Sequence, residues 1–244
     1  MIGIGREAAR RLALAIVLSL GAAAPVWAQG GAAPYATMAP LGEYLMADRG
    51  AEIALARSAA PPAISDDATI MVLGRGGYEV AAKGKNGFVC LVERAWTAPF
   101  DFPEFWNPKM RGPVCYNPAA VRSILPDTVK RTSLALAGRS KPAMLKAIKA
   151  AVARKALPTP QIGAMSYMMS HQQYLNDGAG SWAPHLMFYV PRTGAAAWGA
   201  NLPASPIMLD TDHTEMPESE SIFMMTATKW SDGTPFVQGE DHNH

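Results

Sequence analysis

Three histidines are the residues of this chain best placed to hold a catalytic metal. His171 and His185 flank a glycine-containing stretch, and His213 lies in an acidic segment beside Asp210 and Asp212. Two imidazoles and a carboxylate can hold zinc and leave a coordination position open for water or substrate. No HExxH or comparable spacing accompanies them. A small metal-dependent hydrolase using His171 and His185 with acidic neighbours is therefore an alternative function and not the leading one.

Methionines in the last third of the chain suggest copper handling as a minor alternative. Met165, Met168 and Met169 precede His171, and thioether and imidazole ligands suit Cu(I). Side chains alternate between the two faces of a strand, so methionines that fill a sheet core explain this pattern more simply. We therefore expect no bound cofactor.

Motifs for covalent catalysis are missing from the sequence. It contains no Gly-x-Ser-x-Gly and no Ser-x-x-Lys, which are typical of serine nucleophiles. Ser170 and His171 are adjacent, and neighbours on a strand point to opposite faces. The sequence leaves enzymatic activity open and favours a protein without it.

Five aromatic residues on a proline-rich stretch are the candidate ligand-binding group. Rings on such a stretch could line a groove for an apolar ligand, a sugar or a peptide, or pack inward over the sheet. The first possibility supports the leading hypothesis, a non-enzymatic ligand- or partner-binding protein of the cell envelope. The five residues are Trp96, Phe100, Phe102, Phe105 and Trp106.

The first 28 residues predict export. Arg6, Arg10 and Arg11 precede an apolar run at 12–24, and small residues lead to a cleavage site between Ala28 and Gln29. A run of about 13 residues is shorter than the roughly 20 that span a bilayer, so we expect no stable membrane span after its removal. The expected location is periplasmic or secreted.

Charge gives no reason to expect nucleic acid as a partner. The chain has 22 basic and 20 acidic residues, and removing the three arginines and one glutamate of residues 1–28 leaves 19 of each. A neutral chain without basic blocks has no electrostatic attraction for a polyanion. The expected partner is a ligand or an envelope protein of unknown identity.

Cys90 and Cys115 are the only cysteines of the chain. In an exported protein an even pair of cysteines predicts a disulfide, because the environment is oxidising. A thiolate nucleophile or metal pair would lack the CxxC spacing that supports it. We therefore expect one intramolecular bridge.

Several short strands and a few helices, without regular βα alternation, predict an α+β fold with a mostly antiparallel sheet, a few packed helices and one disulfide. Residues 29–40 are expected to be a flexible leader, 41–238 a single globular α+β domain and 239–244 a disordered polar tail. Four prolines make 94–117 an irregular loop. Helices are expected at 41–56, 118–125, 140–157 and 195–200, and strands at 69–73, 164–169, 185–190, 207–210 and 221–226.

A hairpin is expected at 78–94, with its turn at 83–87, because Asn86-Gly87 suits the type I′ turn. The stretch Lys83 to Cys90, together with Cys115, resembles uncharacterised secreted bacterial proteins. These proteins pair a Gly-x-Asn-Gly-aromatic-x-Cys hairpin with a second downstream cysteine. The resemblance implies export, the hairpin and the disulfide, and it implies no activity.

Overall fold

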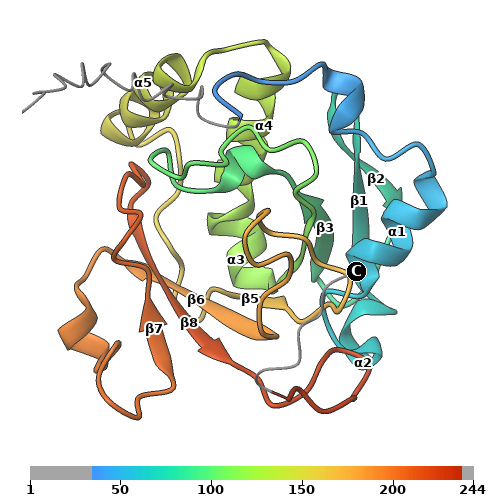
Figure 1. Cartoon of the computed structure of the whole chain (residues 1–244), viewed down its shortest axis with the longest axis vertical. Helices are drawn as coiled ribbons and strands as arrows, with labels where there is room; N and C mark the ends of the chain where they lie inside the picture. Colours follow the sequence, from blue (N-terminus) through green and yellow to red (C-terminus); the bar gives the residue numbers. More distant parts are fainter. Residues whose placement is uncertain (1–34, 238–244) are drawn as a thin grey trace, which may run out of the picture. The chain divides into compact units, whose positions relative to one another are not determined.

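One mixed sheet organises residues 35–237, the part of the chain that this computed structural model describes (Figure 1). The strand order is β2-β1-β3-β4-β5-β6-β8-β7, and neighbouring strands are antiparallel except for the parallel pair β1 and β3. The α+β class is thereby confirmed. The strands are β1 (Thr69–Gly74), β2 (Gly77–Ala82), β3 (Val89–Glu93), β4 (Gly112–Tyr116), β5 (Met165–Met168), β6 (His185–Pro191), β7 (Ile207–Leu209) and β8 (Glu220–Thr226).

Helices pack on both faces of the sheet. Leu91 and Val114 pack with Ile124, which joins α3 to α4, whereas Val92 packs with Leu55 of α1 on the other face. This division follows from the alternation of side chains along β3. The helices are α1 (Arg49–Arg57), α2 (Pro62–Ser65), α3 (Pro118–Ser123), α4 (Leu125–Leu136) and α5 (Lys141–Ala153), with 3-10 turns at Leu41–Glu43, Ala95–Thr97 and Ala195–Trp198.

The predicted disulfide is confirmed. Cys90 of β3 and Cys115 of β4 lie directly opposite each other in the antiparallel ladder, with their Cα atoms 3.9 Å apart. Both side chains are fully buried under α1, in the core cluster that contains Leu55 and Ile70. The bridge therefore ties together two central strands of the sheet.

The predicted pairing of 78–82 with 88–92 is wrong, because β1 lies between β2 and β3. The hairpin that does form joins β1 to β2 through Arg75 and Gly76. The segment 83–88 crosses β1 instead: Gly84 N donates to Thr69 Oγ1 at 3.0 Å, and Asn86 Oδ1 accepts from Phe88 N at 3.0 Å. This local side-chain turn replaces the type I′ turn. Residue 84 must be glycine, because an added Cβ would lie 2.3 Å from backbone atoms of residues 67 and 68.

Three α-helices or strands occur where the sequence predicted none: α2, β4 and α4. The expected loop 94–117 contains β4, which tolerates Pro113 because β4 pairs with β5 only at Cys115 and Tyr116. Proline lacks the N–H that a second ladder would need there. Helix α4 follows α3 almost at once, and Pro126 lies in its first turn, where the missing N–H costs nothing.

The remaining predictions of elements agree closely with the structure. The strands at 69–73, 164–169, 185–190, 207–210 and 221–226 are confirmed as β1, β5, β6, β7 and β8, and the helix after Ser140 is α5. The helix expected at 41–56 is divided into a 3-10 turn and α1, because Asp48 caps α1 by accepting from Gly50 N at 2.7 Å.

The ends of the chain are only partly described. The predicted signal peptide, its cleavage site and the tail 239–244 lie outside the described residues, as does the leader before Tyr35. Met38 and Ala39 are partly buried against the core cluster of Tyr44 and Trp106. No helix within residues 35–237 is long and apolar enough to cross a membrane.

The short strand β7 forms one edge of the sheet. The side chain of Asn201 holds its outer side: Asn201 Nδ2 donates to the carbonyl of Leu209 at 2.9 Å, and Asn201 Oδ1 accepts from Leu209 N at 3.0 Å. Asn201 N also donates to the carbonyl of Ile207 at 3.0 Å. An asparagine with φ of 59° is thus built into the edge, a conformation that asparagine tolerates better than most residues.

Candidate functional site

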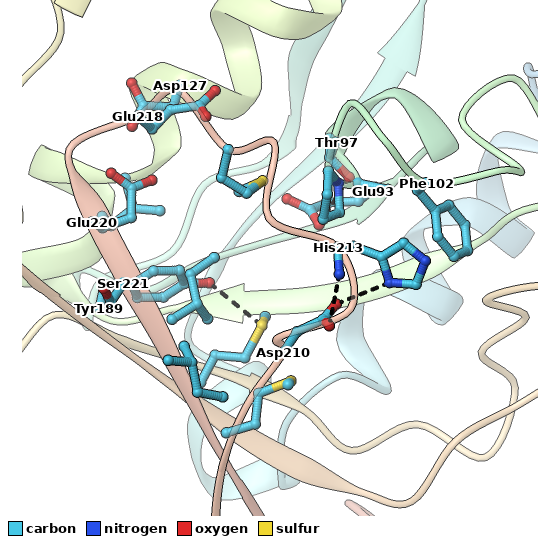
Figure 2. Close-up of a pocket in the computed structure, with 18 of the residues that line it drawn as sticks. Glu93, Thr97, Phe102, Asp127, Tyr189, Asp210, His213, Glu218, Glu220 and Ser221 are labelled. Atoms are coloured by element: carbon cyan, nitrogen blue, oxygen red, sulfur yellow. Dashed lines mark hydrogen bonds and ion pairs between the residues drawn. The ribbon is translucent and has the colours of Figure 1, made fainter. Parts of the chain in front are cut away.

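A cavity of about 480 Å³ lies beside the face of the sheet that α3 and α4 cover (Figure 2). Apolar side chains of β5, β6 and β8 form its floor: Met168, Met187, Ile222 and Met224. Polar groups reach it from α4, from the end of β3 and from the segment 209–221. A mostly apolar cavity in which a few polar groups converge is the usual form of a small-molecule site.

Three carboxyl groups gather at one end of this cavity. Figure 2 shows Asp127 of α4 beside Glu218 and Glu220, and all three are nearly fully buried. Glu218 is paired, because its two oxygens accept from Arg131 Nε at 2.6 Å and Arg131 Nη2 at 2.9 Å. Asp127 Oδ1 and Glu220 Oε2 are buried without a hydrogen-bond partner among the described residues. This wall therefore has more acceptors than the surrounding side chains satisfy.

The surroundings of Asp127 and Glu220 favour their neutral forms. Burial, reinforced by Glu220 and Glu218, raises the pKa of Asp127 to about 8, and Arg131 offsets only part of this. Burial and Glu218 raise the pKa of Glu220 to about 7, against the opposing charges of Arg131 and Arg192. Both groups therefore exchange protons near neutral pH, as carboxyls at functional sites often do.

Stability should fall as pH rises through this range. A carboxyl whose pKa is raised on folding holds a proton that the unfolded chain has released, so the free energy of unfolding falls between its ordinary pKa near 4 and the raised value. Buried His185, with a pKa lowered to about 4, opposes this trend only below its ordinary value of 6.5. We expect a loss on the order of 2 kcal/mol between pH 6.5 and 8.5 in urea unfolding. Asp127→Asn should remove most of that loss, and an unchanged slope would contradict the assignment.

Glu93 forms a separate and fully partnered group in the cavity wall. Its Oε1 accepts from Tyr116 Oη at 2.5 Å and from Thr128 Oγ1 at 3.1 Å, and its Oε2 accepts from Thr97 Oγ1 at 3.3 Å. Burial raises the pKa of Glu93 although these hydrogen bonds favour the carboxylate. Because its partners belong to β4, α4 and the turn after β3, Glu93 fixes the relative positions of these elements.

The three histidines occupy different surroundings. His185 lines the cavity, and its Nδ1 donates to the carbonyl of Ala183 at 2.8 Å. His213 also lines the cavity, with Nδ1 3.3 Å from Asp210 Oδ2. His171 stacks on Trp230 and is not a lining residue. Within residues 35–237, no three His, Cys, Asp or Glu side chains are grouped so that they could hold a metal ion.

The predicted aromatic group is divided. Trp96, Phe100, Phe105 and Trp106 are buried in a core cluster with Met144 and Ile148 of α5. This is the inward packing that the sequence left open as the alternative. Phe102 alone of the five lines the cavity, where its ring meets the edge of His213.

The positions of the methionines do not match those that the copper hypothesis needs. Of Met165, Met168, Met169 and His171, only Met168 lines the cavity. Met187 and Met224 join it there because they face each other across the β6–β8 ladder. The flexible thioethers form an adaptable apolar floor.

The acidic wall was not predicted from the sequence, although its residues carry a signal there. Every second position from 218 to 224 holds an acidic or an apolar residue: Glu218, Glu220, Ile222 and Met224. On a strand this spacing places the two carboxyls on the same face as the apolar side chains. Acidic residues that continue an inward-facing apolar pattern indicate a buried polar site.

Comparison with known proteins adds no family to this description. No protein-family model matches the chain, and no curated protein or solved structure is significantly similar to it. The fold and the site define an α+β protein with a single bridge between central strands and an acid-walled cavity.

Proposed function

We propose that this protein is an exported, non-enzymatic binding protein that holds a small amphipathic molecule in the cavity above β5, β6 and β8. The observation that carries the proposal is the cavity itself: about 480 Å³, floored by methionines, with buried carboxyls at one end. Ligand sites of this kind range from about 300 to 1,000 Å³. A ligand of roughly ten to twenty-five heavy atoms would fit the volume.

Binding is better supported than metal-dependent hydrolysis. The hydrolase hypothesis needs His171 near His185, whereas only His185 and His213 line the cavity. A hydrolase also needs a nucleophile or an activated water beside its acid and base. Glu93, the carboxyl at the end of β3, is held by Tyr116, Thr128 and Thr97, which suits a structural group in the wall.

Export is supported by two independent features. The N-terminal residues have the charge and apolar pattern of a signal peptide that ends at Ala28. The Cys90–Cys115 disulfide is compatible with an oxidising location outside the cytoplasm. The proposed protein works after cleavage in the periplasm or outside the cell, with a ligand or an envelope protein as partner.

Filling the cavity should weaken binding. We expect Met187→Trp to weaken the binding of Nile red, a neutral apolar dye, about tenfold or more, because the larger side chain occupies the floor. Dye fluorescence titration measures the affinity. Met224→Phe, a smaller change on β8, should weaken binding less and provides a second variant if the first fails to fold.

The control for this experiment fills a different hollow. A groove on the α4–α5 pair is lined by Lys130, Ala147 and Arg154. Ala147→Trp fills this groove and should leave dye affinity unchanged. If Ala147→Trp weakens binding and Met187→Trp does not, the dye site lies on α4–α5 and the proposed function is wrong.

A further inference from the structure

The acidic end of the cavity specifies one part of the ligand. This inference rests on the proposed function. Asp127 and Glu220 are each about 5% exposed, and each has one buried oxygen without a donor among the described residues. A buried acceptor without a donor destabilises the folded protein, and more so if it is charged. A ligand that brings donors to these two oxygens would recover that cost.

The basic residues nearby are already occupied. Arg131 donates to Glu218 and also, through Nη1, to the carbonyls of Trp96 at 3.2 Å and Ala98 at 2.7 Å. Arg192 donates through Nη2 to the carbonyls of Met216 and Glu218. Their hydrogen bonds are directed to protein oxygens and to Met216 Sδ, so this end offers a ligand acceptors and potential negative charge. Once both carboxyls are ionised, this end repels an anionic ligand.

We propose that the ligand carries an amine or guanidine cation that donates hydrogen bonds to Asp127 and Glu220, joined to an apolar body that lies over the methionine floor. A cation between two carboxyls gains charge-assisted hydrogen bonds in a site of low dielectric. The apolar body gains from leaving water. Glu93 is not the anchor, because its hydroxyl donors are already in place.

Three probes of equal chain length test the ligand class on the full mature chain: octylamine, 1-octanol and octanoate. Isothermal titration calorimetry and displacement of Nile red measure their affinities at pH 8.5. We expect octylamine to bind about tenfold or more tightly than 1-octanol, and octanoate to bind most weakly. Equal binding of octylamine and 1-octanol, or preference for octanoate, would overturn the inferred cation while leaving the proposed function standing.

Variants of the two carboxyls test whether they cause the preference for octylamine. Asp127→Asn and Glu220→Gln keep the size of each side chain and remove its charge, so each should reduce the preference for octylamine over 1-octanol about tenfold with little change for 1-octanol itself. Asp66→Asn changes an exposed carboxyl outside the cavity and should have no effect. A preference for octylamine that survives both cavity variants would place the cation elsewhere and refute the assignment.

Proton release gives an independent measurement. The raised pKa values of Asp127 and Glu220 mean that a cation must displace protons at neutral pH. We expect the affinity for octylamine to rise about tenfold from pH 6 to pH 8.5, with proton release visible as buffer-dependent heat. Affinity independent of pH would contradict the inference. If no probe binds and Nile red does not bind either, the proposed function fails with it.

Discussion

Glu52→Ala is expected to lower the free energy of unfolding by about 3 to 5 kcal/mol, because it leaves a buried guanidinium without its carboxylate. Arg94 is fully buried and Glu52 is 2% exposed. Glu52 Oε1 accepts from Arg94 Nη2 at 2.9 Å and from Leu73 N at 3.1 Å. Arg94 also donates through Nε to the carbonyl of Tyr44 at 2.7 Å. One ion pair thus joins α1, β1, β3 and the first 3-10 turn.

Urea unfolding measures this loss, and an exposed ion pair provides the control. Arg49 and Glu79 pair at the surface with both side chains more than half exposed. Arg49→Ala should therefore cost less than about 1 kcal/mol. The double variant Glu52→Leu with Arg94→Met removes both charges and should recover much of the loss, as apolar replacements of buried pairs often do. A cost for Glu52→Ala no greater than that for Arg49→Ala would show that Arg94 finds another partner.

Removing the disulfide should cost about 3 to 4 kcal/mol. Cys90 and Cys115 are 25 residues apart, and closing a loop of that length restricts the unfolded chain by this amount in the chain-entropy treatment. The variant carries Cys90→Ala and Cys115→Ala together, so no free thiol remains. Both positions are fully buried under α1, so the lost sulfur atoms add a small packing cost.

A reductant separates the contribution of the covalent bridge from that of the packing of the sulfur atoms. Wild type unfolded in urea with dithiothreitol loses the bridge but keeps both sulfur atoms, so its free energy of unfolding should lie slightly above that of the double alanine variant. The variant itself should not respond to the reductant. Equal stability of oxidised wild type and variant would mean that the bridge does not restrict the unfolded state.

Local patterns predicted most of the strands and the longest helix, but not α2, α4, β4 or the order of the strands in the sheet. The strand at 185–190 follows from a run of β-branched and aromatic residues, and the helix after Ser140 follows from an apolar stripe. Both signals act within a few residues. The parallel pairing of β1 with β3 depends on hydrogen bonds of Gly84 N to the Thr69 hydroxyl and of Asn86 Nδ2 to the Ile64 carbonyl. Such tertiary contacts override a turn preference that the dipeptide has in isolation.

Local patterns were also not enough to predict the candidate site. Aromatic residues on a proline-rich stretch cannot be assigned to a groove or to a core from their types, and most of these rings pack against α5. The cavity instead combines Asp127 of α4 with Glu220 of β8, which are 93 positions apart in the sequence. Only folding brings the two together. Period-two alternation carried a signal for the face of Glu220 that was missed, whereas the contribution of α4 needed the structure.

The hydrogen bonds of Asn201 along β7 bear on how the chain avoids self-association. An edge strand with unpaired N–H and carbonyl groups is a template on which a second chain can add a strand, and this is a common route to aggregation. Asn201 occupies both backbone groups of Leu209 and the carbonyl of Ile207, so β7 offers an incoming strand few free groups. This single asparagine therefore keeps the ladder from continuing into a neighbouring molecule, at the side of the sheet that also holds the methionine-floored cavity.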